Sequence, residues 1–319
     1  MNIGTASASP KLSAALESAP RLVDIGNGRR LAVEVKGAGP TVVLDGGGVG
    51  YGVFGWWGEF DQGLAKFATV VTYDRLGCGY SDGSLEGDVP LTDHAHNLAA
   101  LLDRLPVEQP VVLVGWSFGG LTAQQFACLY PQKVAAILLL DPTMLGGRGS
   151  LDTLPAWQKW MATVVGPFMG RRTASAVRSG TFKNPRARER KQKQILKGFG
   201  PHMPPTEAQM MVDFLFTHPG AQETLVRLIK NLARSIEEVR TIVHQRGLPR
   251  VPLKVLMSGH VPKGMAKLAA KMSAAYAAET KRLGGELRVL GDISHQIPFE
   301  APAECIRAVK ELLARGCPE

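Results

Sequence analysis

Residues 111–120 read VVLVGWSFGG, so that an apolar run passes directly into the pattern Gly-x-Ser-x-Gly centred on Ser117. The apolar run is typical of a buried strand, and Phe118–Leu129 has the pattern of a helix. A serine at a sharp strand-to-helix turn needs small neighbours, because a Cβ beside it would clash in the strained backbone. Gly115 and the pair Gly119-Gly120 supply them. The sequence therefore predicts that Ser117 is a nucleophile presented at such a turn.

On both sides of this turn, short apolar strands alternate with helices. Further strand patterns occur at Arg21–Ile25, Arg30–Val35, Thr41–Leu44, Ala68–Tyr73, Val134–Leu140, Pro252–Met257 and Glu286–Leu290. Further helical patterns occur at Leu91–Leu105, Met265–Leu283 and Ala301–Leu313. Gly26-Asn27-Gly28, between the first two strands, is a hairpin signal. Strands that alternate with helices of about 10–15 residues indicate crossover connections and a parallel sheet.

The alternation stops between residues 144 and 249. This stretch is helical in pattern, is interrupted by prolines, and contains no strand of convincing length. We therefore predict three parts: a loose N-terminal extension (1–20), a core domain (21–143 and 250–319), and a helical cap or lid (144–249) inserted into that core.

The nucleophile needs a base, because a serine hydroxyl reacts poorly near neutral pH, and the base needs an orienting group. His295 follows the last predicted strand and precedes the last helix. The other histidines, apart from His260, lie on the helix before the nucleophile strand or within residues 144–249. His295 is therefore predicted to be the general base.

Three motifs together resemble those of the α/β-hydrolase superfamily, specifically its capped, serine esterase-like branch. They are residues 111–120, the turn Tyr73–Ser81 (YDRLGCGYS) and the segment Ser294–Glu300 (SHQIPFE). The resemblance covers about residues 20–143 and 250–315. It implies an α/β-hydrolase fold, with a mostly parallel central sheet, helices on both faces and a helical cap insertion. It also implies a catalytic triad at a nucleophile elbow.

The acid of that triad departs from the family pattern. Most members carry it after the strand that follows the cap, but no Asp or Glu occurs from Val251 to Ala278. Asp141, at the end of the strand Val134–Leu140, is the predicted substitute, because some α/β-hydrolases carry their acid at this position. Asp292 is the second candidate, although it would have to fold back along its own loop to reach His295.

The loop after the third strand also departs from the family, which commonly has His-Gly where this chain has Asp45-Gly46-Gly47-Gly48. Its glycines allow the backbone to approach a substrate oxygen, so we expect the N–H groups of Gly47 and Phe118 to form the oxyanion hole. A negative charge beside an oxyanion would weaken transition-state stabilisation. We therefore expect Asp45 to have a structural role, hydrogen-bonded to nearby backbone or to Arg75.

The predicted substrate-binding residues are Gly48, Tyr51, Trp57, Trp116 and Trp160. Tyr51 and Trp57 follow the oxyanion loop, Trp116 adjoins the nucleophile, and Trp160 lies among apolar residues of the predicted cap. These apolar side chains favour a largely hydrophobic substrate, whereas the basic residues of the cap leave an anionic substrate group open.

The resemblance implies hydrolysis of a carboxylic ester or lactone through an acyl-enzyme, with Ser117 as nucleophile, His295 as base and Asp141 as acid. A carbon–carbon bond hydrolase, an amidase and a perhydrolase use the same triad and stay open. A receptor that resembles a hydrolase and turns its ligand over slowly is an alternative of another class. Epoxide hydrolases and haloalkane dehalogenases of this fold use Asp as nucleophile, which Ser117 argues against. No metal or organic cofactor is implied.

Composition and charge bear on partners and location. The net charge is +9, and residues 145–250 hold 18 Lys and Arg against 7 Asp and Glu. We interpret this excess as a solvated basic face and not a nucleic-acid or membrane surface, because Lys183–Lys197 has no aromatic residue for base stacking. No apolar run approaches the ~20 residues that span a bilayer. Residues 1–20 lack the pattern of a secretory signal, and the four cysteines show no paired spacing. We expect a cytoplasmic protein that acts on a small molecule, with its oligomeric state open.

Overall fold

The structure is a computed structural model. It describes residues 20–48, 52, 56, 58–82, 90–146, 148–149, 221–261 and 263–316, together with a few residues between 172 and 197. Most of the predicted N-terminal extension and most of the predicted cap lie outside these residues. The division into an extension, a core and a cap therefore stays a prediction.

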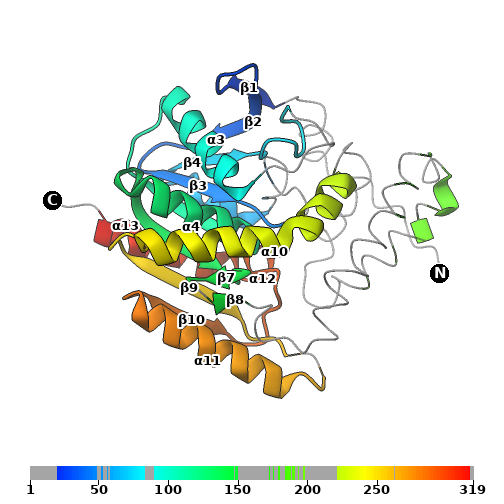
Figure 1. The fold of residues 1–319 in the computed structure, drawn as a ribbon, viewed down its shortest axis with the longest axis vertical. Coiled ribbons are helices and arrows are strands. Elements are labelled where there is room, and N and C mark those ends of the chain that lie inside the picture. The colour runs from blue at the N-terminus through cyan, green and yellow to red at the C-terminus, as the bar shows by residue number, and fades with distance from the viewer. Residues whose placement is uncertain are drawn as a thin grey trace.

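An eight-stranded sheet forms the centre of the molecule (Figure 1). Its strands are β1 (Arg21–Asp24), β2 (Arg30–Lys36), β3 (Thr41–Asp45), β4 (Thr69–Tyr73), β5 (Val111–Trp116), β6 (Val134–Leu140), β9 (Leu253–Ser258) and β10 (Glu286–Leu290). Their spatial order is β1-β2-β4-β3-β5-β6-β9-β10. The pairs β1–β2 and β2–β4 are antiparallel, and all other neighbours are parallel. The predicted α/β class and mostly parallel sheet are confirmed, as is each predicted strand.

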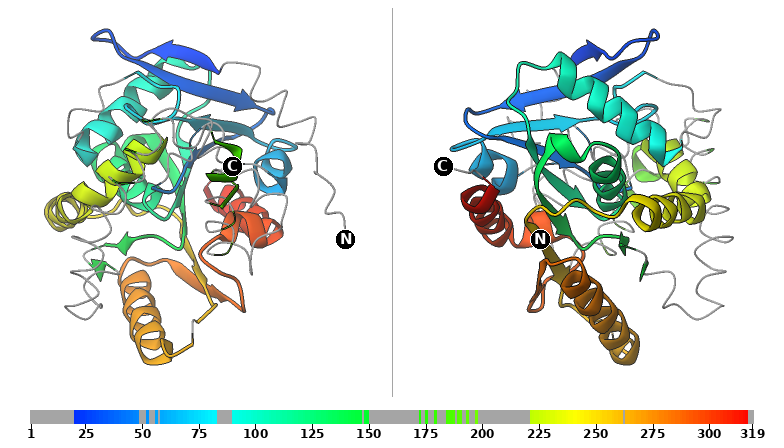
Figure 2. Two further views of the ribbon diagram at one scale, coloured as in Figure 1. Left: turned by 90° about the vertical axis from the view of Figure 1, so that its right-hand side faces the viewer. Right: turned by 60° about the vertical axis from the view of Figure 1, so that its left-hand side comes forward.

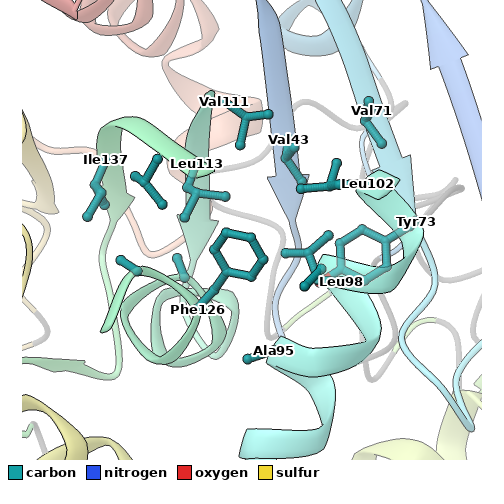
Figure 3. Packing of buried hydrophobic residues seen from close by; sticks show 14 of the residues in the cluster. Val43, Val71, Tyr73, Ala95, Leu98, Leu102, Val111, Leu113, Phe126 and Ile137 are labelled. Carbon is teal, nitrogen blue, oxygen red and sulfur yellow. The ribbon is translucent and has the colours of Figure 1, made fainter. Parts of the chain in front are cut away.

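Helices cover both faces of this sheet (Figure 2). One face is covered by α3 (Leu91–Arg104), α4 (Gly119–Leu129) and α11 (Ala266–Arg282), and the other by α2 (Glu59–Leu64), α12 (Ile297–Glu300) and α13 (Pro302–Gly316). A short 3₁₀ helix, η1 (Pro131–Lys133), leads into β6. Successive strand residues point to opposite faces. Val43 accordingly packs toward Phe126 of α4 and Leu102 of α3, as Figure 3 shows, whereas Val42 and Leu44 belong to the core on the other face.

One long helix of the predicted cap is described. This helix, α10 (Ala221–Arg246), lies along α4 in Figure 1, and its Ile236, Val239 and Val243 are buried against Leu121 and Phe118. The sequence reaches it through the two-residue strands β7 (Met144–Leu145) and β8 (Arg148–Gly149), an antiparallel pair that the sequence pattern did not predict. The apolar stripe of α10 therefore fixes this helix beside the start of α4.

Strand register decides which loops meet at one edge of the sheet. Trp116 pairs with Leu140, and Leu140 pairs with Leu256, so β5, β6 and β9 end side by side. Ligands of open α/β sheets bind outside the carboxyl ends of the strands. Ser117 and Asp141 each begin the loop that follows one of these strands.

None of the helices in the described part of the chain combines the length and the hydropathy that a bilayer crossing requires.

Candidate active site

Ser117 occupies a strained turn between β5 and α4. Its φ is 55°, a conformation that residues with a Cβ rarely adopt. The neighbouring strand holds the turn, because the N–H of Ser117 donates to the carbonyl of Leu140 (2.9 Å) and the N–H of Thr143 donates to the carbonyl of Ser117 (3.1 Å). A Cβ on Gly119 would lie 2.0 Å from the carbonyl oxygen of Asp45. Glycine is therefore required where the loop after β3 crosses the turn.

His295 connects Ser117 to Asp141. Its Nε2 lies 2.9 Å from Oγ of Ser117, and its Nδ1 lies 2.6 Å from Oδ2 of Asp141. The three residues come from the loops after β5, β6 and β10. The structure thus brings together the three side chains predicted as a triad, in the order nucleophile, base and orienting acid.

Asp141 is held by β9 as well as by His295. Its N–H donates to the carbonyl of Leu256 (2.7 Å), and its carboxylate accepts bonds from the N–H (3.2 Å) and Oγ (3.0 Å) of Ser258. Burial alone would raise the pKa of Asp141, but the hydrogen bond and charge of His295 and the two bonds from Ser258 bring that pKa below its usual value. Asp141 is therefore an anion at neutral pH.

The second candidate acid has a different partner. Oδ1 of Asp292 lies 2.6 Å from Nδ1 of His260, at the surface. Because Asp141 occupies Nδ1 of His295, the geometry favours Asp141 as the orienting acid.

Trp116 lies under His295. It is only 1% exposed, its ring packs edge-on against Phe299, and its indole N–H donates to the carbonyl of His295 (2.9 Å). We predicted a substrate contact for Trp116, whereas the structure directs its side chain into the core. The alternation of β5 could have revealed this, because Val112, Val114 and Trp116 point to the same face.

Two further polar residues hold the site and were not singled out from the sequence. Ser258 supports the acid, as described above. Glu300 closes the histidine loop, because its carboxylate accepts bonds from both the N–H (2.8 Å) and the Oγ of Ser294. Ser294 and Glu300 lie close together within one short sequence motif, and this spacing could have predicted the contact between them.

The predicted oxyanion donors lie beside the nucleophile. Phe118 is the N-cap of α4, and the first N–H groups of a helix have no partner within it. The loop after β3 reaches the same place, since a Cβ on Gly48 would lie 4.0 Å from Cβ of Phe118. Gly47 and Gly48 are thus near Phe118, and their predicted roles toward an oxyanion and a substrate stay predictions.

Asp45 is buried under this loop and paired. It forms an ion pair with Arg75, as predicted, and accepts a hydrogen bond from the hydroxyl of Tyr73 (2.6 Å). Burial, followed by the charge of Asp45, raises the pKa of Tyr73 well above its usual value, so its hydroxyl stays protonated and donates. Arg75 also donates to the carbonyls of Gly46 (3.0 Å) and Gly47 (2.9 Å).

Tyr51, Trp57 and Trp160, the other predicted substrate contacts, lie outside the described residues. Trp56, from the same aromatic stretch, is 3% exposed and packs against Phe60 and Trp116 in the core.

Comparisons with known proteins agree with this architecture. Residues 40–178 match a family model described as alpha/beta hydrolase fold. An uncharacterized protein of Mycobacterium tuberculosis is 36% identical over 115 residues, which are 36% of this chain and 33% of that protein. The 2-hydroxymuconate semialdehyde hydrolase of Pseudomonas sp. (strain CF600) is 36% identical over 121 residues, which are 36% of this chain and 41% of that enzyme.

These matches cover about a third of the length of the first curated relatives. The crystal structure of wild-type Cfl2 from Burkholderia cenocepacia superimposes with a TM-score of 0.64 at 20% identity, covering 91% of this chain and 94% of that one. At that identity the likeness shows the fold alone.

Proposed function

Because the chain belongs to the α/β-hydrolase fold superfamily, we propose that it is a serine hydrolase that cleaves a carboxylic ester or lactone through an acyl-enzyme. Its substrate is small and largely hydrophobic. The observation that carries the proposal is the hydrogen-bonded series from Ser117 through His295 to Asp141, with separations of 2.9 and 2.6 Å. These distances lie within the reach required for proton transfer and for orientation of the base.

In the first half of the reaction, Oγ of Ser117 attacks the carbonyl carbon while Nε2 of His295 accepts its proton. Asp141 fixes the imidazole through Nδ1 and stabilises the imidazolium. The N–H groups of Phe118 and Gly47 bind the oxyanion. The intermediate then collapses, His295 returns the proton to the leaving oxygen, and the acyl group stays on Ser117.

In the second half, water attacks the acyl-enzyme. His295 accepts a proton from that water and passes it to Ser117 as the second tetrahedral intermediate breaks down to the free acid. Every proton that His295 accepts is passed on within the cycle, so the reaction balances with the substrate, water and these residues.

A carbon–carbon bond hydrolase is the second candidate, because a 2-hydroxymuconate semialdehyde hydrolase matches part of this chain. The same triad serves that reaction. Turnover of a vinylogous 1,5-diketone with little activity on esters and lactones would favour it.

The test combines labelling with turnover. A fluorophosphonate probe should attach to Ser117, as located by mass spectrometry, and p-nitrophenyl acetate and a panel of aliphatic lactones should be hydrolysed. Ser117→Ala should abolish labelling and lower kcat by about 10⁶-fold. Ser273→Ala, on the outer helix α11, is the matched serine control and should change neither.

Wild-type turnover by Ser117→Ala would refute the scheme. Stoichiometric labelling with negligible turnover on every substrate would favour a hydrolase-like receptor instead.

A further inference from the structure

Arg75 is a buried cation directly behind the oxyanion loop. Its side chain is only 4% exposed, and Asp45, which balances its charge, is 5% exposed. The guanidinium carbon also lies 5.1 Å from the ring centroid of Phe118. Arg75 therefore contacts both segments that carry the proposed oxyanion donors.

Arg75 also donates hydrogen bonds to the loop that are not needed to neutralise Asp45. Nη1 donates to the carbonyl of Gly46 (3.0 Å) as well as to Asp45, and Nη2 donates to the carbonyl of Gly47 (2.9 Å). A planar guanidinium can hold two such acceptors at once in a fixed geometry, which an ammonium cannot.

The carbonyl of Gly46 and the N–H of Gly47 belong to one peptide group. A trans peptide is planar, with its C=O and N–H pointing in opposite directions. Anchoring the Gly46 oxygen on Arg75 therefore directs the Gly47 N–H away from the guanidinium. The bond to the Gly47 oxygen fixes the Gly48 N–H in the same way.

This anchoring matters because the loop has no side chains of its own to hold it. Three consecutive glycines follow Asp45, and glycine backbone populates conformations that other residues avoid. A charged donor on a peptide oxygen also polarises that peptide, which strengthens the hydrogen bond its N–H can donate.

We infer that Arg75 is a positioning residue, which holds and polarises the Gly46–Gly47 peptide so that the Gly47 N–H meets the oxyanion. The inference rests on the proposed function. The inference also explains the presence of Asp45 in the site. The Asp45 carboxylate, held by the hydroxyl of Tyr73, keeps the guanidinium of Arg75 turned toward the loop. The positive charge of Arg75 in turn balances the negative charge of Asp45.

The test uses two variants that keep the interior compensated. Arg75→Lys retains the positive charge opposite Asp45 but loses the planar guanidinium that holds both carbonyl oxygens. The double variant Arg75→Met with Asp45→Asn removes both charges together. The matched control is Lys36→Met with Asp61→Asn, which removes a partly buried ion pair (3.0 Å) between β2 and α2. Thermal unfolding of each protein measures the cost in stability.

Two readouts separate positioning from general destabilisation. The first is kcat and KM on p-nitrophenyl acetate. The second is inhibition by trifluoroacetophenone, which forms an oxyanion adduct with a nucleophilic serine, compared with acetophenone, which binds without one.

For both Arg75 variants we expect kcat to fall about 10- to 100-fold, less than the 10²–10³-fold effect of removing an oxyanion donor outright. KM should stay within about threefold, and the Ki of trifluoroacetophenone should rise by the same factor as kcat falls. The Ki of acetophenone should not change. The control pair should lose stability with kcat unchanged.

The inference is overturned if the folded Arg75 variants keep kcat and trifluoroacetophenone affinity within threefold of wild type. It is also overturned if both ketones weaken equally, since that result indicates a structural role only. If the wild type shows neither Ser117-dependent turnover nor adduct formation, the proposed function fails and the inference falls with it.

Discussion

Replacing Asp141 with asparagine should disable the base while leaving the fold intact. The N–H of Ser258 donates to Oδ1 of Asp141 and can only donate, so an asparagine must keep its oxygen at that position. Its NH₂ group then takes the place of Oδ2 and donates to Nδ1 of His295. The imidazole is forced into the tautomer with hydrogen on Nε2, which faces Ser117 and cannot accept its proton.

The size of the effect follows from two contributions. A unit charge about 4 Å from the imidazolium contributes about 4 kcal/mol at an effective dielectric constant of about 20, which corresponds to about 10³-fold in rate. The wrong tautomer adds a further factor of about ten. Together they give the about 10⁴-fold loss in kcat that is typical of such a change in a serine triad.

The assay is kcat on p-nitrophenyl acetate at neutral pH, with thermal unfolding to verify the fold. Asp292→Asn is the matched control, because Asp292 pairs with His260 instead, and its kcat should stay within a few-fold of wild type. A loss of less than tenfold for Asp141→Asn, or an equal loss for Asp292→Asn, would refute the assignment of the acid.

Two further predictions concern buried polar groups. Ser258→Ala removes one hydrogen bond to the charged Asp141 and keeps the backbone bond, so kcat should fall about tenfold, whereas Ser258→Thr, which keeps a hydroxyl, should restore most of it. An unchanged kcat in Ser258→Ala would contradict the supporting role. His94 is buried, and burial, followed by the charges of Arg75 and Arg227, lowers its pKa from 6.5 to about 3. The unfolded chain therefore binds a proton that the native protein excludes between these values. The free energy of unfolding is therefore highest above pH 6.5, where His94 is neutral in both states. It decreases as the pH falls toward 3, by about 1.4 kcal/mol per pH unit. Urea denaturation between pH 6.5 and 4.5 should show a smaller pH dependence in His94→Gln than in wild type; equal slopes would refute this reading.

The sequence was sufficient for the strands and for the meeting of Ser117, Asp141 and His295, and the reason is physical. Buried parallel strands appear in the sequence as short apolar runs. The loops that follow them meet at the carboxyl edge of the sheet, regardless of which side chains these loops carry. Ser117 and Asp141 each come directly after such a strand, so the strand alone places them. His295 lies further along the loop after β10, and the family resemblance supported its assignment as the base and that of Asp141 as the acid.

Contacts that depend on side-chain direction or on the partner across a loop were less accessible. Trp116 adjoins the nucleophile in sequence but turns into the core. Ser258 looks like an ordinary loop serine until the register of β6 against β9 places it on Asp141. The two hydrogen bonds from Arg75 to peptide oxygens could not be predicted from the residue types, because every residue offers the same backbone acceptor.

The position of Asp141 directly after β6 places the acid close to the nucleophile along the chain as well as in the sheet. The nucleophile, its acid and both proposed oxyanion donors all precede residue 144, and only His295 follows the predicted cap. An acid on β9 would have to be returned to the site by whatever segment joins it to β6. Here Ser117 and Asp141 follow adjoining strands, and the pairing of Trp116 with Leu140 sets the nucleophile beside its acid. The nucleophile and its acid thus form a unit that β5 and β6 carry by themselves, and His295 is the one member of the three that must be brought to it from beyond residue 249.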